Sequence, residues 1–338
     1  MKLVNYDIID DSYYLFTCAE LRVREIEFLD KNRIERMLKS QELNEFTRVL
    51  RDTVYSRYIN DIESSRNFEE VIVGEYSTAI RFLSDRLKPG HQAAGDLLFL
   101  EGNLHNLKVI IKSIILDTDL GRLFIPILYP YEKLRNAALT GNYEEINPSV
   151  ADILRFAVEL IERQKNHRFL EFELEEFYLK QVSNSIEKLS SRLIKDYFKH
   201  IIDILNIKNI YRNKHLKDSL SFSRFLHDNG FLPKEFMMKF GDESLDFFLK
   251  EMERTDYADI VIKGTNILHS EGTFSSFEKG EDLFYLDFFD PVKYSVSNLE
   301  RVFLFFLRKK IELKYLNIIF TGILYSIDIA KIKNKVEV

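Results

Sequence analysis

One helical pattern occurs three times in this chain, and the repetition constrains its fold more than any other feature. The three copies are Asn103-x-x-Asn106-Leu107-x-x-Ile110, Asp203-x-x-Asn206-Ile207-x-x-Ile210 and Glu312-x-x-Tyr315-Leu316-x-x-Ile319. Offsets of three, four and seven residues lie on one face of an α-helix. Each copy therefore predicts a helix with the same stripe, and we call the three helices the organising helices.

A second signature precedes each copy at a nearly constant distance. It is an apolar residue and a glutamate, followed seven residues later by a tyrosine, in Phe68-Glu69…Tyr76, Leu170-Glu171…Tyr178 and Phe277-Glu278…Tyr285. The glutamate precedes the organising pattern by 34, 32 and 34 residues. Two linked signatures predict three related units of roughly 100 to 110 residues, an ordinary domain size. We place these units at residues 1–118, 119–218 and 219–338.

Few helix-breaking residues interrupt the chain. Its 338 residues include 6 Pro and 12 Gly, which favours long helices over short strands and turns. A hydrophobic fraction of 46% is enough for a sizeable core and argues against disorder. The 28 Phe and 17 Tyr are most simply used to fill that core. We predict an all-α protein, in which Val71-Ile72-Val73 and Ile260-Val261-Ile262 belong to helices.

Composition also limits the functional classes. A net charge of −6 argues against general nucleic-acid binding, which needs a cationic surface. The single cysteine excludes an internal disulfide framework and fits a reducing compartment. No secretory signal is apparent. The longest suitable uncharged run, Tyr315–Ile327, has 13 residues and is too short to span a bilayer. We expect a protein that is soluble, or peripheral to a membrane through a partner.

Motifs for catalysis and metal binding are sparse. The chain contains no glycine-rich phosphate loop, no Cys/His zinc spacing and no His-Glu-x-x-His or Glu-x-x-His motif. Glu101 and His105 lie one turn apart, but two ligands do not make a metal site. Paired carboxylates are best represented by the acidic cluster Glu171, Glu173, Glu175 and Glu176, for which a solvated helix face is the simpler interpretation. We therefore predict no catalytic, cofactor-binding or metal-binding residues and no small-molecule substrate.

Three further features each have a functional and a structural interpretation. Cys18 is either a reactive thiol or a small buried hydrophobe, and the second is favoured because no low-pKa motif surrounds it. Arg22 and Arg24 either bind an anion or belong to a helix face of alternating charge that is solvated or ion-paired, and the second is favoured. The closing lysines contact lipid head groups or an acidic partner, or form a solvated tail at the end of the final helix: Lys331, Lys333 and Lys335.

Local patterns add three more predictions. The polar residue repeated in the organising helices is most simply a structural hydrogen-bond anchor. Residues 19–29 form a helix with an apolar stripe at Leu21, Ile26 and Leu29. Ser149 caps a helix over residues 150–163.

Several segments resemble, in their order and spacing, one known family. They are Leu21-Arg22-Val23-Arg24, Leu50-Arg51-Asp52-Thr53-Val54-Tyr55, Asn103-Leu104-His105-Asn106-Leu107-Lys108, Asn206-Ile207-Lys208, and Glu312 with Tyr315-Leu316-Asn317-Ile318-Ile319. The chain resembles, over almost its whole length, the adaptor subunit of the rotary V-type ATPases. That subunit is called C in prokaryotic complexes and d in eukaryotic ones.

The resemblance implies a funnel or socket of three similar helical domains in a pseudo-threefold arrangement. One end would sit on the membrane ring of proteolipid subunits, and the other would receive the foot of the central shaft. The protein would be peripheral to the cytoplasmic face of a membrane. It would have no active site, and would carry torque between ATP hydrolysis and proton or sodium transport.

Such a role needs an apolar surface patch, and Phe303, Phe305 and Phe306 are candidates either for that patch or for the core. Two other functions stay open at this point. One is a soluble helical-repeat scaffold that binds a different helical partner. The other is an enzyme that uses the carboxylates between Glu171 and Glu176.

Overall fold

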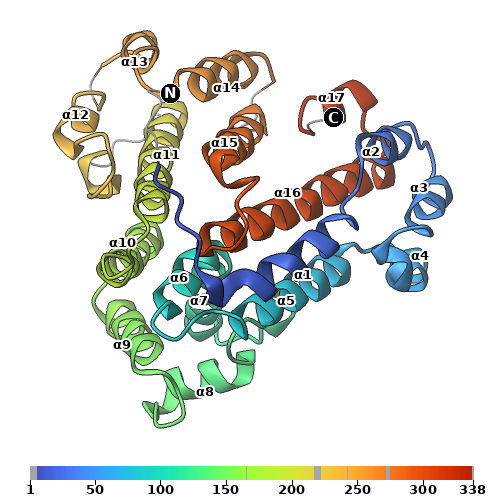
Figure 1. Ribbon diagram of the computed structural model, residues 1–338. Helices are drawn as coiled ribbons and strands as arrows, with labels where there is room; N and C mark the ends of the chain where they lie inside the picture. The colour runs from blue at the N-terminus through green and yellow to red at the C-terminus, as the bar shows by residue number, and fades with distance from the viewer. Residues whose placement is uncertain (1–5, 165, 217–221, 242, 272–274, 337–338) are drawn as a thin grey trace. The chain divides into compact units, whose positions relative to one another are not determined.

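The computed structural model describes residues 6–164, 166–216, 222–241, 243–271 and 275–336 (Figure 1). Every regular element within these residues is a helix, and no strand occurs among them, which confirms the all-α prediction. The chain divides into two compact units, one formed by Met1–Ala79 with Lys199–Val338 and the other by Ile80–Phe198. We describe each unit by itself.

The first unit brings together the two ends of the chain. Its helices are α1 (Leu15–Glu25), α2 (Lys31–Leu38), α3 (Leu43–Leu50), α4 (Ile59–Ser65), α12 (Lys234–Met238), α13 (Leu245–Met252), α14 (Ala258–Glu271), α15 (Ser275–Phe288), α16 (Leu299–Leu324) and α17 (Ile329–Lys333). Its 3-10 turns are η1 (Ser12–Tyr14), η2 (Val54–Tyr58), η4 (Phe222–Phe225) and η5 (Asp290–Val292).

The second unit contains α6 (Gln92–Leu98), α7 (Leu100–Ile115), η3 (Gly121–Leu123), α8 (Tyr131–Thr140), α9 (Pro148–Arg163) and α10 (His167–Ile186). Two helices have residues in both units, α5 (Glu69–Ser84) and α11 (Arg192–Leu216). The three organising helices are α7, α11 and α16, as the repeated pattern predicts. The three signature tyrosines lie on other helices and are all buried: Tyr76, Tyr178 and Tyr285.

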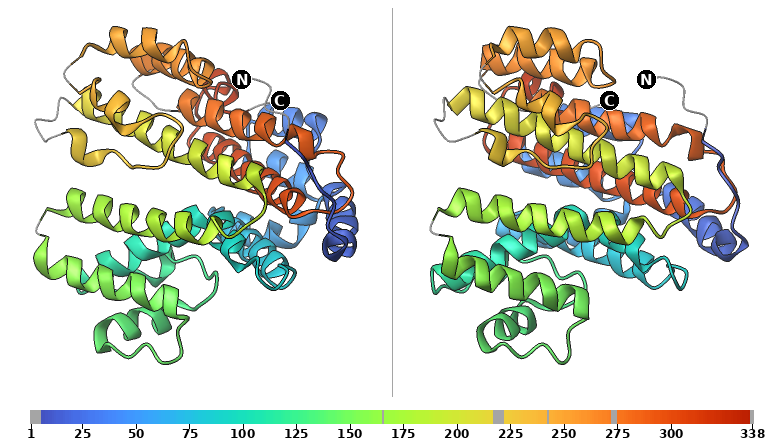
Figure 2. Two further views of the ribbon diagram at one scale, coloured as in Figure 1. Left: turned by 60° about the vertical axis from the view of Figure 1, so that its left-hand side comes forward. Right: turned by 90° about the vertical axis from the view of Figure 1, so that its left-hand side faces the viewer.

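The longest helix, α16, forms the centre of the first unit. It is buried along most of its length, and α1, α3, α15 and α17 pack against it (Figure 1). Phe320 lies at its C-terminal half, with ring centroids 5.2 Å from Phe68 and 6.0 Å from Phe46. Figure 2 shows α14 and α15 lying side by side as a helical hairpin in the same unit. The aromatic load is therefore used in the core, where each buried ring stabilises the fold by roughly 1.5 to 3 kcal/mol.

The side chains of Phe303, Phe305 and Phe306 belong to this core, with exposed fractions of 2%, 4% and 3%. They do not form the surface patch that the adaptor role requires. An apolar helix surrounded by other helices buries residues on all its sides, so these consecutive phenylalanines do not divide into a core face and a surface face. An exposed apolar surface occurs elsewhere, on α1.

In the second unit α7, α9 and α10 pack together around a core of leucine, isoleucine and valine. The N-cap of α9 is Asn147, whose Oδ1 accepts a hydrogen bond of 3.0 Å from the Ser149 backbone nitrogen. The prediction that Ser149 caps this helix was therefore wrong. The helix begins one residue after Asn147, because Pro148 at the first helical position needs no hydrogen-bond partner for its nitrogen.

None of the helices in the described parts of the chain is long and apolar enough to cross a bilayer. Although α16 has 26 residues, it carries Arg301, Lys309 and Glu312 in its buried interior.

Candidate functional site

The predicted acidic cluster on α10 is a set of separate ion pairs. Glu171 lies 3.0 Å from Lys112, and Glu175 lies 2.9 Å from Lys108. The Glu173 carboxylate is 3.4 Å from Arg163. Each of these carboxylates has its own cation, so the arrangement is that of a charged helix face and not of two acids sharing a reacting atom.

Glu101 and His105 are likewise not brought to a common ligand. The Nε2 atom of His105 lies 2.6 Å from the carbonyl oxygen of Leu123, and both side chains are exposed. In the described parts of the chain, no three His, Cys, Asp or Glu side chains are grouped to hold a metal ion.

Cys18 is buried, and its Sγ lies 3.6 Å from the carbonyl oxygen of Asn298. Burial raises the pKa of this thiol, which confirms the interpretation as a small buried hydrophobe. Arg22 donates to the Ser295 carbonyl oxygen at 2.6 Å, and Arg24 pairs with Glu20 at 3.3 Å. Lys331 and Lys333 lie in the last turn of α17 and are exposed.

Two organising helices use the repeated asparagine to hold the loop that follows them. In α7, Asn106 Nδ2 donates to the Ile125 carbonyl at 2.6 Å, and its Oδ1 accepts from the Ile125 nitrogen at 2.9 Å. In α11, Asn206 makes the same pair with His227, at 2.9 and 2.7 Å. A carboxamide presents a donor and an acceptor side by side, as a backbone does. The predicted hydrogen-bond anchor is confirmed for these two copies.

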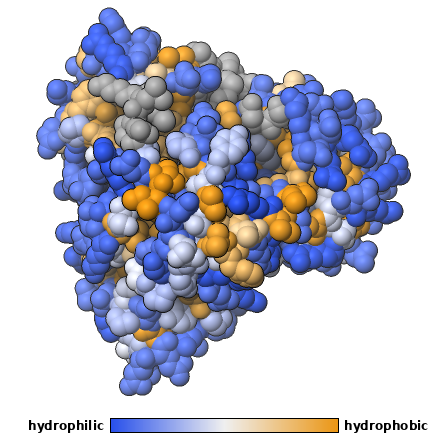
Figure 3. Space-filling view, viewed as in Figure 1, coloured by the Kyte–Doolittle hydropathy of each residue, from blue (hydrophilic) through white to orange (hydrophobic). Residues whose placement is uncertain are grey.

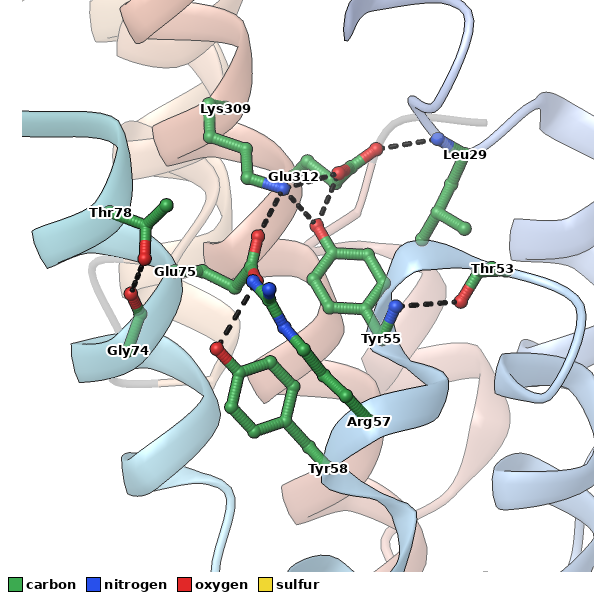
Figure 4. Close-up of polar contacts among 10 residues, drawn as sticks. All are labelled: Leu29, Thr53, Tyr55, Arg57, Tyr58, Gly74, Glu75, Thr78, Lys309 and Glu312. Atoms are coloured by element: carbon green, nitrogen blue, oxygen red, sulfur yellow. Dashed lines mark hydrogen bonds and ion pairs between the residues drawn. The ribbon is translucent and has the colours of Figure 1, made fainter. Parts of the chain in front are cut away.

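The third copy replaces this asparagine with Tyr315 and concentrates its polar contacts one turn earlier (Figure 4). Glu312 Oε1 accepts a hydrogen bond from the Tyr55 hydroxyl, and Oε2 accepts from the Leu29 backbone nitrogen at 2.5 Å. Lys309 Nζ donates to the Tyr55 hydroxyl at 2.8 Å and lies 3.6 Å from Glu312. These contacts attach α16 to segments more than 250 residues earlier in the chain.

Lys309 also connects α16 to α5, because its Nζ lies 2.8 Å from Glu75 Oε2 (Figure 4). Glu75 forms a second ion pair with Arg57 and accepts from the Tyr58 hydroxyl at 3.2 Å. The Lys309 and Glu75 side chains are only 11% and 6% exposed, so water does little to stabilise their charges.

The two carboxyls that share Lys309 have opposite pKa shifts. Burial alone would raise the pKa of Glu75, but the cations of Lys309 and Arg57 hold it below its ordinary value. For Glu312 burial outweighs Lys309 and the hydrogen bonds from Tyr55 and Leu29, so its pKa is raised. The difference follows from distance and number, since Glu75 has two close cations and Glu312 has one cation farther away.

An equivalent cluster connects α11 to residues that follow it in the chain. Asp203 Oδ2 accepts from the Tyr257 hydroxyl at 2.6 Å and from the Phe231 nitrogen at 3.0 Å. Three residues before the acid, His200 Nδ1 lies 2.7 Å from the same hydroxyl, as Lys309 lies beside Tyr55. Both α11 and α16 therefore carry an acidic and a basic side chain, three residues apart, that contact the hydroxyl of one tyrosine from another segment.

The two tyrosines also have the same local turn, which the sequence analysis did not identify. The backbone nitrogens of Tyr55 and Tyr257 each donate at 3.2 Å to a threonine hydroxyl two residues earlier, on Thr53 and Thr255. A repeated Thr-x-Tyr triplet was the available signal. It is short, and its distance from the signature glutamate differs between the two copies, so it does not stand out without the structure.

We expect Asp203→Asn to weaken the dependence of stability on pH. Burial raises the pKa of Asp203 from 3.8 to about 6, against the hydrogen bonds from Tyr257, Leu232 and Phe231. The folded protein therefore binds this proton more tightly than the unfolded chain. The stabilising contribution is complete below pH 3.8 and is lost as the pH rises through about 6. The loss is roughly 2 to 3 kcal/mol.

Urea titrations of the wild type and Asp203→Asn between pH 4 and pH 7 measure this effect. The free-energy difference between the two proteins should change by that amount across the range. Asp228→Asn is the control. Asp228 is exposed and lies between α11 and α12, in the same segment as the Phe231 and Leu232 nitrogens that Asp203 binds, and its replacement should leave the pH dependence unaltered. Parallel wild-type and Asp203→Asn curves would show that Asp203 does not titrate in this window.

The first helix carries an apolar stripe that faces solvent. Phe16, Val23 and Ile26 are 76%, 64% and 80% exposed, and with the exposed Ala19 they follow one another at spacings of three, four and three residues. We call these four residues the α1 stripe. Figure 3 shows apolar side chains over α1 on the face turned to the viewer. The expectation that Ile26 shares a stripe with Leu21 was wrong. Leu21 faces the core, whereas Ile26, at the C-cap of α1, faces solvent.

The other side of α1 is held firmly against the first unit. Leu21 and Cys18 are fully buried there, and Glu25, at the last helical position, forms ion pairs with Arg301 and Arg308 of α16. The α1 stripe is therefore an apolar surface on a rigid support, with the spacing that a partner helix needs for interlocking contacts.

Comparison with known proteins relates this architecture to one family. The family model described as ATP synthase (C/AC39) subunit matches residues 17–335. The chain is 22% identical over 320 residues to the C subunit of the V-type sodium ATPase of Enterococcus hirae, covering 94% of this chain and 96% of that protein. It is 23% identical over 302 residues to the C subunit of the A-type ATP synthase of Methanocaldococcus jannaschii, covering 83% and 75%.

Proposed function

Because the chain belongs to the ATP synthase (C/AC39) subunit family, the C subunits of V- and A-type ATPases, we propose that it is the non-catalytic rotor adaptor of such a complex. It links the central shaft to the membrane ring of proteolipid subunits and carries torque for proton or sodium transport. The chain is peripheral to the membrane, and reaches it through the ring.

The observation that carries this proposal is the α1 stripe. Large apolar side chains that remain in solvent on a well-packed helix favour a role in protein–protein contact over a role in the core. The spacing of Phe16, Ala19, Val23 and Ile26 matches a short heptad seam, which fits a helical partner such as a coiled-coil shaft. Charges of both signs flank the stripe, Glu20 and Glu27 on one side and Arg22 on the other, and would set the partner's orientation.

Mechanical stiffness supports the same role. A torque-bearing element should not bend or slide under load, and close-packed helices resist both. Lys309 and Glu312 attach α16 to three other segments of the first unit, at Leu29, Tyr55 and Glu75, so sliding α16 by one turn would leave several charges buried without partners.

The proposal includes three related helical units, at residues 1–118, 119–218 and 219–338, in a funnel with pseudo-threefold symmetry. Two repeated devices favour common descent of the units. One is the asparagine–loop pair of α7 and α11, and the other is the acid–tyrosine pair of α11 and α16.

Affinity purification of the tagged protein from detergent-solubilised native membranes tests this function. The shaft, proteolipid and head subunits should be recovered together in stable proportions and identified by mass spectrometry. Recovery of the chain alone, or with unrelated soluble proteins, would contradict the adaptor role. That result would favour a helical-repeat scaffold with a different helical partner.

A further inference from the structure

The second unit contains a cavity lined by the repeated stripe of its organising helix. Asn103, Asn106, Leu107 and Ile110 of α7 form one wall. The opposite wall is one face of α10, at the same helical spacing, with Tyr178, Gln181, Val182 and Ser185. The loop at residues 124–129 and the first turn of α9 complete a cavity of about 80 Å³.

In all three organising helices the first polar residue of the repeated pattern contacts a tyrosine hydroxyl, in the pairs Asn103–Tyr178, Asp203–Tyr257 and Glu312–Tyr55. Tyr257 contacts the acid of α11, and it directly precedes α14, the helix before the signature helix α15. In the second unit the helix before the signature helix is α9, and the residue directly preceding it is Asn147. The Asn147 side chain is exposed and caps its own helix, and the phenol beside Asn103 comes instead from Tyr178 of the signature helix α10.

One carboxylate lines the cavity and is half-buried. Asp96 of α6 lines it, and within the described residues of this unit no hydrogen bond or ion pair reaches its side-chain oxygens. The nearby Tyr178 hydroxyl is directed to the backbone oxygen of Asp96 at 3.4 Å and receives a hydrogen bond from Asn103 at 2.8 Å. Burial without a compensating partner raises the pKa of Asp96 to about 6. At neutral pH the wall therefore holds an unpaired negative charge.

We propose that this cavity binds a small organic cation, an ammonium group on a short alkyl or aryl body. The ammonium would donate to Asp96, with the side-chain oxygens of Gln181 and Ser185 available on the facing wall. The apolar body would occupy the space between Leu107, Ile110 and Ile153. An apolar cavity with a few converging polar groups is the usual form of a ligand site.

Three probes of one shape and different charge test the proposal on the full chain: benzylamine, benzyl alcohol and benzoate. Ligand-observed NMR titrations at pH 7.5 should give a benzylamine affinity at least tenfold higher than that of benzyl alcohol, with benzoate weakest. Asp96→Asn should reduce the preference for benzylamine over benzyl alcohol to about threefold or less. Equal affinities for the two probes in the wild type, or no binding of either, would overturn the inference.

Two further variants locate the binding. Val150→Phe places a ring at the half-buried edge of the cavity and should weaken benzylamine and benzyl alcohol alike by at least tenfold. Glu162→Gln removes an exposed carboxylate from the same helix, away from the cavity, and should change neither affinity. Loss of the benzylamine preference in Glu162→Gln, or its persistence in Asp96→Asn, would assign the effect to general surface charge. Far-UV circular dichroism melts confirm that each variant is folded. The result does not depend on the proposed rotor role.

Discussion

Replacing Lys309 by methionine is expected to lower the free energy of unfolding by about 3 to 5 kcal/mol. The ammonium is the close cation shared by Glu75 and Glu312, and both carboxylates are more than nine-tenths buried. Methionine fills a similar volume but leaves Glu312 without any cation within ion-pair distance among the described residues. Removing one member of a buried charge cluster costs more than the pair contributes, because the remaining charge stays buried.

Urea unfolding followed by far-UV circular dichroism measures the effect, since the chain has no Trp to report by fluorescence. The matched control is Lys234→Met, which removes a lysine from an ion pair with the exposed Asp228 and should cost less than about 1 kcal/mol. Adding Glu75→Gln to Lys309→Met should cost at least about 1 kcal/mol less than the sum of the single changes. Additive costs, or equal costs for the two lysines, would show that the cluster is not electrostatically coupled.

Changing the α1 stripe should abolish assembly without unfolding the protein. In the double variant Phe16→Glu with Val23→Glu, two side chains that are 76% and 64% exposed become charged. Because both already face water, the free energy of unfolding should change by no more than about 0.5 kcal/mol. A partner helix seated on the stripe would have to bury both charges. We therefore expect recovery of the shaft subunits in the affinity purification to fall by at least roughly tenfold.

The control for this experiment makes the same chemical change at another surface. Leu116 and Leu139 of the second unit are 63% and 52% exposed, and their double change to glutamate should leave recovery of the shaft unaltered. If both double variants lose the shaft, added negative charge is the cause and not the α1 stripe. If neither loses it, the shaft contacts a different surface, while the family membership stands.

Local residue order was enough to predict much of the fold. The three organising helices and the signature tyrosines follow from the 3.6-residue period, which depends on neighbours within two turns. The repeated Asn106 and Asn206 identified the anchors correctly, because a polar residue on an apolar stripe needs a partner wherever the helix packs. The solvated-face interpretation of the acidic cluster was correct only in part, because Glu171 is 36% exposed whereas Glu175 is 15% exposed and pairs with Lys108 of the neighbouring α7.

The identity of each partner, by contrast, depends on which distant segments meet. No period in the sequence links Glu312 to Tyr55 or Lys309 to Glu75, because those contacts arise only when the last long helix packs against the beginning of the chain. Whether an apolar side chain is buried or exposed also depends on which distant segments meet. Phe303 and Phe16 are the same residue type. Other helices pack around α16, whereas among the described residues one side of α1 stays exposed, and this difference makes Phe303 a core residue and Phe16 a surface residue.

The cavity beside Asp96 depends on tertiary structure most of all. The α7 stripe has the same pattern as those of α11 and α16, yet its surroundings differ, since Asn103 contacts Tyr178 of the signature helix whereas Asp203 contacts Tyr257, directly before α14. The residue order therefore determined the helices, their stripes and the positions of their polar anchors, since these follow from local geometry. Tertiary packing alone decided that the α7 stripe lines a cavity, that the α1 stripe faces solvent and that Asp96 has no cation among the described residues of its unit, since each depends on side chains brought together from distant positions.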